Sequence, residues 1–519
     1  MLKLRTIFNI GALLIIIVIV VNCNSTSDKS SRKIPSGINV SEGKKLAEQY
    51  CSTCHPFPKA EILPTHYWGR VLPIMGFFLG AGKQKFKFAD YSNPVAKMRL
   101  TASGLFPDSQ LIATKDWIAI NNYYLYMSPK KLIETDNLNI EMDLGQFTVE
   151  QIPWKSGHEG LTYLNFVNGN YELGYNTSND SYYLKLDSNG NEIEKTKTDH
   201  PLVDVIKRDN SEYLLLMGQM NNIDEPTGKL LLKNNGLKEL LDPLERPISF
   251  EIEDFNNDGE ENILIAEFGK FLGGINIYNL RDPESKLNIY SSPGAVKTIV
   301  KDVNNDGLKD FYVLMAQADE SVYLFMNQGD FKFNIKSLIT MPSYYGTTNF
   351  ELLDMDGDGD DDIICSSGDS GDFGIVFKPF HGVRLFENQG NNQYEQVWFH
   401  PQQGAYGTAS ADYDNDGDID IASIGYFASY LNRNKELFIY FENKGNEIVN
   451  WKFKPHSFRG DKNDCWIVIN NADVDNDGDI DILLGANSKV LNPERKAEKL
   501  NEWQQDGGMV TVLRNNLIN

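Results

Sequence analysis

The sequence is short of positive charge. Lys and Arg number 49 against 72 Asp and Glu, and the net charge at neutral pH is −23. Binding to a phosphate backbone depends on basic surface patches, and no such patch stands out, which argues against nucleic acid as a partner. The chain also lacks GxSxG, HExxH and GxGxxG motifs and an obvious paired acid and base. An enzyme with this sequence would therefore need a cofactor to supply its chemistry.

Long apolar runs are also missing, apart from one near the N-terminus. Residues 11–21 are apolar, follow the basic Lys3 and Arg5, and end shortly before Cys23. This run is too short to cross a bilayer core of about 30 Å as a helix, and the pattern is typical of a signal peptide. An uncleaved N-terminal anchor is the alternative. Both interpretations place the rest of the chain outside the cytoplasm.

This N-terminus resembles that of a bacterial lipoprotein precursor. The resemblance implies that Cys23 is lipidated and becomes the first mature residue, although Asn22 replaces the small residue usual before it. We therefore expect an exported protein held at a membrane by its lipid anchor, in the periplasm or on the cell surface. The expected segments are a signal peptide over 1–23 and a Ser- and Lys-rich tether over 24–38.

Cysteine is scarce, with five residues, but two of them belong to the motif CSTCH at Cys51, Cys54 and His55. Two thiols at this spacing can add to the two vinyl groups of one haem, and the histidine that follows binds the iron. A thioredoxin-like pair would need a βαβ context, and a structural zinc site would need a second Cys or His pair nearby; neither is found. Helix formers before the motif, with Ser41 as N-cap, predict a helix that presents both sulfurs.

Residues 39–133 as a whole resemble a class I cytochrome c domain. They contain the opening helix, CxxCH, a Pro-rich loop and a closing amphipathic segment over 114–127. The spacing in this closing segment predicts a helix that buries Trp117, Ile118 and Tyr124. The resemblance implies an all-α domain that carries covalent haem c.

The resemblance also implies a methionine sulfur as the sixth ligand of the iron. Three methionines lie in this region, Met75, Met98 and Met127. Met127 falls inside the closing helix and is the least suitable. Met75 is preferred over Met98, and the choice between these two stays open at this point.

A nine-residue, Asp-rich pattern recurs five times in the remainder of the chain, beginning at Asp254, Asp302, Asp354, Asp412 and Asp473. Oxygens at positions 1, 3, 5 and 9 suit a hard cation, position 7 can add a backbone carbonyl, and Gly at position 6 allows the sharp turn. The five loops hold 23 of the 72 acidic residues, so bound calcium would neutralise much of the negative charge. The predicted ligands are Asp254, Asn256, Asp258, Asn262, Asp302, Asn304, Asp306, Asp310, Asp354, Asp356, Asp358, Asp362, Asp412, Asp414, Asp416, Asp420, Asp473, Asp475, Asp477 and Asp481.

These loops differ from EF-hands, which need a bidentate Glu at position 12 and helices on both sides. Position 12 is occupied instead by Ile265, Val313, Cys365, Ser423 and Leu484. Extended, apolar runs flank every loop, which predicts a β-hairpin with a cation-binding turn. Asn262 replaces Asp at position 9 of the first loop, so that site should be the weakest. The pattern resembles the FG-GAP, or VCBS, repeats of integrin-like propellers, which implies up to five calcium ions, each between two strands of a blade.

Two further blade-sized segments precede the first loop. Residues 163–176 contain an Asn168-Gly169 turn, and residues 202–218 turn near Asp209 and Asn210, without cation ligands. Two such blades and five loaded ones make seven, a common number for closing a propeller. The predicted fold is a small all-α cytochrome c-like domain followed by an all-β, seven-bladed propeller over 140–519.

The remaining cysteines, Cys365 and Cys465, fall on different, non-neighbouring blades in this register, which predicts buried free thiols rather than a disulfide. Lone histidines such as His158, His381 and His400 lie near predicted blade ends, where a structural role is the commoner one.

Three functions are compatible with this organisation. The first is electron transfer to a redox partner protein, with the propeller docking the chain to a partner or a surface glycan. The second is an oxidoreductase whose propeller oxidises a substrate and passes electrons to the haem. The third is adhesion or scaffolding. The first is preferred because no catalytic site is recognised on the propeller and because a covalent cofactor requires a dedicated export and ligation apparatus.

Overall fold

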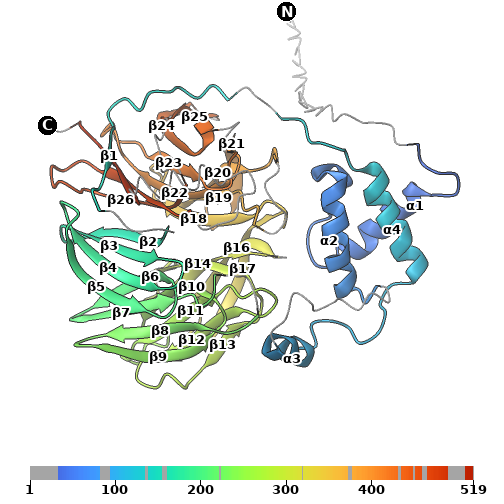
Figure 1. The fold of residues 1–519 in the computed structure, drawn as a ribbon, viewed down its shortest axis with the longest axis horizontal. Coiled ribbons are helices and arrows are strands. Elements are labelled where there is room, and N and C mark those ends of the chain that lie inside the picture. The colour runs from blue at the N-terminus through green and yellow to red at the C-terminus, as the bar shows by residue number, and fades with distance from the viewer. Residues whose placement is uncertain are drawn as a thin grey trace, which may run out of the picture.

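The computed structural model contains a helical region followed by a β-propeller (Figure 1). The signal peptide, Cys23 and most of the tether lie outside the described residues, as does His158. No helix in the described part of the chain is long and apolar enough to cross a membrane. The structure describes residues 33–81, 94–134, 138–154, 160–220, 224–317, 319–371, 377–429, 434–447, 450–458, 465–488 and 509–517.

The helical region contains four α-helices and one short 3₁₀ helix. Their bounds are α1 Val40–Cys51, η1 Ala60–Ile62, α2 Thr65–Phe78, α3 Pro94–Ala102 and α4 Thr114–Met127. A core of aromatic and aliphatic side chains joins α1, η1, α2 and α4; its members are Ala47, Ala60, Leu63, Tyr67, Trp68, Leu72, Ile112, Ile120, Tyr123 and Tyr124. The all-α character predicted for this region is confirmed.

Two details of the predicted helices were wrong. Asn39, and not Ser41, caps α1, because the Asn39 side-chain oxygen accepts the N–H of Glu42 at 3.1 Å. In α4, Ile118 is 54% exposed, while Tyr124 is buried and Trp117 is half-buried. The buried face of α4 is set by its close contact with α1, and Ile118 points away from that contact. The bounds of α4 match the predicted closing helix.

The propeller consists of seven four-stranded antiparallel sheets, so the predicted blade number is confirmed. Blade 1 contains β2 Gly160–Val167, β3 Asn170–Asn176, β4 Ser181–Asp187 and β5 Glu192–Thr198; blade 2 contains β6 Leu202–Arg208, β7 Ser211–Leu216, β8 Gly228–Lys233 and β9 Leu237–Leu244; blade 3 contains β10 Pro247–Glu253, β11 Asn262–Glu267, β12 Gly274–Asn279 and β13 Leu287–Tyr290. Blade 4 contains β14 Ala295–Lys301, β15 Asp310–Ala316, β16 Glu320–Asn327 and β17 Phe333–Met341; blade 5 contains β18 Thr347–Leu353, β19 Asp362–Ser367, β20 Gly382–Asn388 and β21 Tyr394–Pro401; blade 6 contains β22 Ala405–Ala411, β23 Asp420–Gly425, β24 Phe438–Glu447 and β25 Asn450–His456; blade 7 contains β26 Trp466–Ala472, β27 Asp481–Ala486, β28 Val510–Arg514 and β1 Thr148–Gln151.

Blade 7 combines the two ends of the propeller. Its first three strands come from the C-terminal end of the chain, while its outer strand, β1, precedes blade 1. The two strands pair antiparallel, with Thr148 opposite Arg514 and Gln151 opposite Thr511. This pairing fastens the first strand of the propeller to the last and closes the ring.

The burial of the strands explains why the sequence folds into blades. Every residue of β11, β19, β23 and β27 is buried, because each of these second strands packs against neighbouring blades on both faces. The first strands of successive blades contact one another, so they surround the common axis of the ring. Cys365 lies in β19 of blade 5 and Cys465 just before β26 of blade 7; both are buried and neither forms a disulfide with another described cysteine, as predicted.

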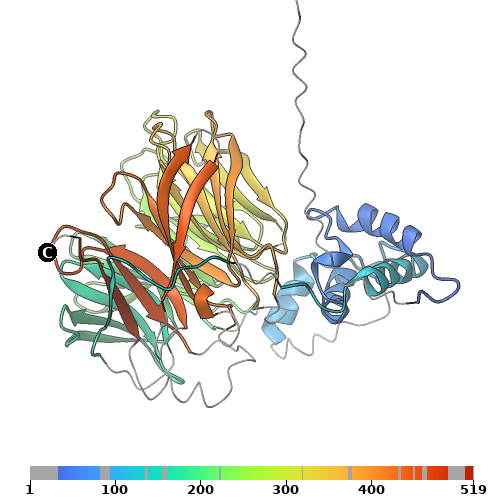
Figure 2. The same cartoon turned by 90° about the horizontal axis from the view of Figure 1, so that it is seen from above.

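The helical region contacts one face of the propeller (Figure 2). In an antiparallel blade, successive connections alternate between the two faces, so the Asp-rich loops between first and second strands all lie on one face. Contacts with α3 instead involve Asp224, Glu245 and Phe271, which lie in connections of the opposite face. The helical region therefore docks on the face opposite the Asp-rich loops.

The docking contact combines a bidentate ion pair with an aromatic cluster. Both terminal nitrogens of Arg99 donate to the carboxylate of Glu245, one of them at 3.0 Å, and Arg99 also donates to the Asp224 carbonyl at 3.2 Å. Beside this pair, the rings of Phe78, Phe106 and Phe271 lie 5.2 to 5.8 Å apart. Bidentate Arg–carboxylate pairs fix orientation as well as distance, so this contact sets how α3 sits on the propeller.

Reversing the charge at Arg99 should release the helical region. In Arg99→Glu, two carboxylates would face each other in a half-buried contact, which should open the docked arrangement and raise the radius of gyration measured by small-angle X-ray scattering. Lys115→Glu, the same reversal at an exposed position of α4, is the control and should leave the scattering unchanged. Identical curves for Arg99→Glu and the unaltered chain would contradict this docking contact.

Candidate functional site

The CSTCH segment begins at the last residue of α1. Cys51 ends the helix and is half-buried, whereas Cys54 is exposed in the turn that follows; both are free thiols. Burial raises the pKa of the Cys51 thiol, while a hydrogen bond with Tyr124 opposes that rise. The two sulfurs are thus presented from one helix end, as thioether attachment to a single porphyrin requires.

His55 is held by its own neighbour. Its Nδ1 lies 3.0 Å from the carbonyl oxygen of Pro56, which favours the tautomer with a proton on Nδ1. A second hydrogen bond of this kind orients the ring of a metal-binding histidine and leaves Nε2 as the ligand atom. The arrangement fits a proximal iron ligand.

An incompletely covered apolar surface surrounds the motif. Several apolar side chains pack against the core of the helical region while remaining partly exposed; they include Leu46, Tyr50, Phe57, Ile62, Val71, Leu79 and Trp117. Such a surface is what a flat apolar cofactor would cover. The donor set and its surroundings therefore fit haem c.

The helix crossing next to the motif depends on Gly43. A Cβ atom at Gly43 would lie 2.2 Å from the Ala119 carbonyl oxygen and 2.9 Å from Cβ of Tyr123, so α1 and α4 touch through their backbones. One turn further along α1, Ala47 is fully buried. Only small residues allow this approach, and it places the end of α1, with Cys51, against Tyr124 of α4.

The structure separates the three methionines considered as ligands. Met75 lies half-buried in α2, next to Gly76, which packs against the indole of Trp117. Met98 is 66% exposed on α3, the helix that docks on the propeller, and Met127 is 41% exposed at the end of α4. Met75 therefore remains the preferred candidate.

The five Asp-rich loops share one backbone conformation. Position 4 has a left-handed φ of 56° to 76° in every loop and is Asn or Gly, and Gly at position 6 has a φ of 86° to 101°. The carboxylate at position 1 accepts the N–H of that glycine at 2.8 to 3.1 Å in all five. These two left-handed residues fold the chain back so that the side chains at positions 1, 3 and 5 converge.

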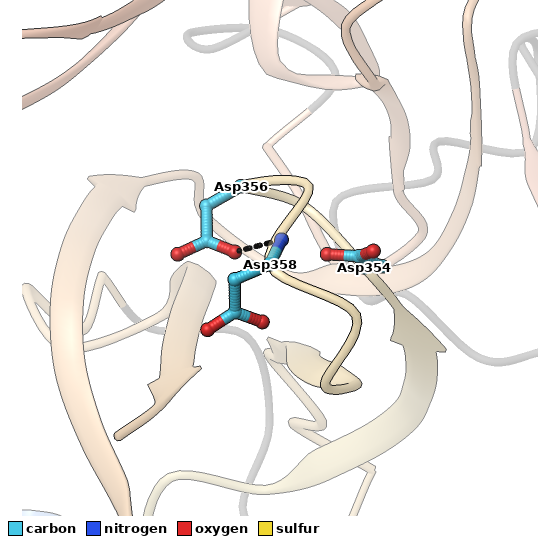
Figure 3. Close-up of side chains that lie close together, drawn as sticks. All are labelled: Asp354, Asp356 and Asp358. Atoms are coloured by element: carbon cyan, nitrogen blue, oxygen red, sulfur yellow. Dashed lines mark hydrogen bonds between the residues drawn. The ribbon is translucent and has the colours of Figure 1, made fainter. Parts of the chain in front are cut away.

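Carboxylate oxygens gather closely in three of the loops. Asp354, Asp356 and Asp358 each offer an oxygen within 4.8 Å of the others (Figure 3). Two further groups of this kind are Asp412, Asp414 and Asp416, and Asp473, Asp475 and Asp481. Oxygens on opposite sides of a calcium ion lie about 5 Å apart, so these clusters are compatible with Ca²⁺.

The remaining two loops replace the position 3 carboxylate by an amide. Asn256 and Asn304 each donate from Nδ2 to the carboxylate at position 5, at 2.7 and 2.8 Å. The buried Oδ1 of Asn256 accepts no hydrogen bond from the described residues and stays available as a ligand. These loops thus hold the same shape with fewer negative charges.

The crowding of carboxylates carries an electrostatic cost. Burial, reinforced by the charge of Asp416, raises the pKa of Asp418 to about 6, and burial raises that of Asp420 to about 7. Burial likewise raises the pKa of Asp362 and of Asp481 to about 6. A divalent cation would relieve this repulsion, which is a further observation that fits the donor set to calcium.

Position 9 has a second role that the sequence did not reveal. Its side chain is at most 1% exposed in every loop, and one of its oxygens accepts the N–H of position 2 at 2.9 to 3.2 Å. In blades 4 to 7, its other oxygen accepts a backbone N–H at 2.7 to 2.8 Å from an asparagine in the third strand or directly after it; these asparagines are Asn327, Asn388, Asn443 and Asn515.

In blades 4 and 7, this asparagine also connects its blade to the preceding one. Asn327 of blade 4 donates from Nδ2 to the carbonyl of Phe255, which is position 2 of the loop in blade 3, at 2.7 Å. Asn515 of blade 7 makes the same bond, also at 2.7 Å, to Tyr413 in the loop of blade 6. An Asn-x-Gly triplet recurs at Asn327, Asn388 and Asn443 and could have found these three residues in the sequence, but Asn515 is not followed by it.

Of the two histidines considered as catalytic candidates within the described residues, His381 is buried and His400 is partly buried. His381 is 1% exposed, and burial lowers its pKa well below the usual value; burial also lowers the pKa of His400 to about 4. A polar hollow of about 850 Å³ lies instead on the face of the Asp-rich loops, between blades 1 and 2. Lys207, Glu212 and Lys233 line it together with hydroxyl and amide side chains.

Comparison with known proteins agrees with the repeat architecture. A family model described as FG-GAP-like repeat matches residues 302–365, from the start of one Asp-rich loop to the strand after the next. The propeller contains an FG-GAP-like repeat. No curated protein matches the chain.

Among solved structures, the N-terminal domain of Nup159 is 9% identical and aligns over 73% of this chain and 98% of its own length, with a TM-score of 0.41. The computationally designed Ika8 protein is 11% identical over 70% of this chain and 99% of its own, with a TM-score of 0.37. The V. cholerae biofilm matrix protein Bap1 is 16% identical over 53% and 44%, with a TM-score of 0.30. These TM-scores are too low to support the fold assignment, so the assignment of a propeller rests on the strand pairing alone.

Adding a methyl group at the α1–α4 crossing should destabilise the helical region. Gly43→Ala should cost about 1–3 kcal/mol through overpacking, despite a helix-propensity gain of up to about 1 kcal/mol. Gly69→Ala in α2, where a new Cβ meets nothing within 4 Å, should be neutral or stabilising. Thermal unfolding followed at the helical band of the circular dichroism spectrum would measure both. Equal effects at the two glycines would contradict the close crossing.

Restoring the carboxylate at position 9 of the first loop should strengthen its cation site. Asn262→Asp adds a negative charge among the ligands, and we expect a gain in calcium affinity of roughly tenfold or more at one site in isothermal titration calorimetry. Asn257→Asp adds the same charge at position 4, which is exposed and not a ligand. If both variants gained equally, general charge and not ligation would explain the effect.

Proposed function

We propose that the chain is an exported electron-transfer protein that carries one covalent haem c in its helical region and calcium in the Asp-rich loops of its propeller. The observation that carries the haem assignment is the combination of two free thiols at the end of α1 with a histidine whose Nδ1 is tied to Pro56. Bound haem would supply a one-electron couple. The chain contributes thioether attachment through Cys51 and Cys54 and the axial nitrogen of His55.

The propeller is proposed as the binding module. Its two faces differ. The helical region docks on one face, and the Asp-rich loops and the polar hollow lie on the other. The loops would hold calcium, which stiffens hairpins that have little core of their own. The hollow offers lysine, glutamate, hydroxyl and amide groups, which suit a polar partner surface or a glycan. The N-terminal segment supports attachment to a membrane through lipid on Cys23.

An electron carrier is favoured over an oxidoreductase because the two candidate histidines, His381 and His400, do not line the polar hollow. Burial also favours the neutral forms of both histidines. Direct reduction of the purified protein by a sugar or an alcohol, without a protein donor, would overturn this preference.

The haem proposal predicts a covalent chromophore that depends on Cys54. Protein produced in a host competent for cytochrome c maturation should be coloured and should keep its haem on a denaturing gel. Cys54→Ala, at an exposed position, should lose one thioether bond and much of the retained haem, whereas Ser52→Ala within the same motif should keep it. A colourless product from a competent host would contradict the assignment.

A sulfur-to-iron absorption band lost in Met75→Ala but kept in Met98→Ala would identify Met75 as the sixth ligand of the iron.

A further inference from the structure

Two of the Asp-rich loops are nearly identical in sequence but differ in what lies against them. The loops at Asp412 and Asp473 share eight of nine residues, and only position 2 differs. In each blade an asparagine binds position 9; it is Asn443, within the third strand of blade 6, and Asn515, directly after the third strand of blade 7. The residue before that asparagine is Glu442 in blade 6 and Arg514 in blade 7.

Arg514 reaches into the carboxylate cluster of the Asp473 loop. Its Nη1 lies 3.3 Å from the carboxylate of Asp475 and 3.4 Å from that of Asp481, the residues at positions 3 and 9. These are two of the three carboxylates whose oxygens gather within 4.8 Å in this loop. The guanidinium is largely enclosed, with 15% of the side chain exposed.

The Asp412 loop of blade 6 differs in the contact that it makes with a basic side chain. Within the described part of the chain, no Lys or Arg side chain forms an ion pair with the Asp412 loop. Lys444 pairs with Glu442 and is 45% exposed; it also attracts Asp414 and Asp416 electrostatically, without forming an ion pair with them. Glu442 also accepts a hydrogen bond from His456 at 3.1 Å. Among the described residues, the Asp412 loop therefore has only the more exposed Lys444 near it, whereas Arg514 forms ion pairs with two carboxylates of the Asp473 loop.

We propose that Arg514 is a built-in counter-ion of the Asp473 loop, which lowers the affinity of that loop for calcium relative to the Asp412 loop. This inference rests on the proposed calcium loading of the propeller. A positive charge a few ångströms from a divalent cation repels it even where water screens the interaction. Loop sequence alone would assign these two sites equal affinity.

Arg514 has a second partner that makes the competition reversible. Its Nε donates to Glu150 at 3.1 Å, and Glu150 lies on β1, the strand that closes the ring. Calcium entering the Asp473 loop would weaken the contacts of Arg514 with Asp475 and Asp481. The guanidinium would then keep its ion pair with Glu150. Calcium at this loop is therefore coupled to the pairing of β1 with β28, and the coupling is reciprocal.

The test is a calcium titration of the full-length protein and three variants. Arg514→Gln should raise the affinity of one site by about tenfold or more, because a positive charge next to the ligands is removed. Arg514→Lys keeps the charge and should retain most of the low affinity. Glu150→Gln removes the competing partner, holds Arg514 on the loop and should lower the affinity of the same site. Combining Arg514→Gln with Asp477→Asn, which removes a ligand of this loop, should abolish the gain.

The outcomes separate this inference from the proposal on which it rests. Calcium binding with equal affinities in the unaltered chain, Arg514→Gln and Glu150→Gln would overturn the role of Arg514 and leave calcium loading intact. No calcium binding by any of the proteins would overturn both. Because Glu150 is half exposed, Glu150→Gln should fold normally and gives a result even if Arg514→Gln unfolds.

Discussion

The side chain at position 9 of each Asp-rich loop is the constraint on which the blades depend. It is buried at the entry of the second strand, where it accepts the N–H of position 2 and, in blades 4 to 7, an N–H in the third strand or directly after it. One residue thus ties the loop to two strands of its blade. A buried carboxylate is tolerated there because backbone donors satisfy its oxygens, and an added cation would remove the remaining cost.

This constraint explains why the loops repeat so faithfully while the rest of each blade varies. The turn needs two left-handed residues and a buried acceptor, and these requirements fall within nine consecutive residues. The strands around it need only to be apolar and extended. Blades 1 and 2 dispense with the loop and use short turns at Asn168 and Asp209, both with left-handed φ values of 52° and 53°. Lysine and glutamate pairs such as Lys185 with Glu212 connect these two blades instead.

Features that lie close together in the chain could be predicted, and features that depend on distant residues could not. The strands on either side of the five loops, the turn at Asn168 and the bounds of α4 follow from local pattern. The asparagines in the third strands or directly after them lie 17 to 34 residues from the position 9 side chains that they bind, so no local pattern connects the two. The exposure of Ile118 was mispredicted for a similar reason, because Gly43 of α1 decides which face of α4 is buried.

The helical region and the propeller are arranged so that each can have a separate role. Arg99 and the aromatic cluster around Phe271 fix α3 to one face of the propeller, while the polar hollow and the Asp-rich loops lie on the other. The haem that we propose at CSTCH and the binding surface that we propose on the loop face would therefore not compete for the same area. The bidentate pair with Glu245 gives this arrangement a definite orientation.

Ring closure has a consequence for how the chain acquires its structure. Because β1 pairs with β28, the blade that seals the propeller contains both the earliest and the latest strands of the ring. Contacts between such remote segments form slowly. A long stretch of chain must first lose conformational entropy, and the contacts offset this loss only once they have formed. β1 keeps an unpaired edge until β28 has been synthesised. During that interval the nascent protein is most exposed to aggregation and proteolysis.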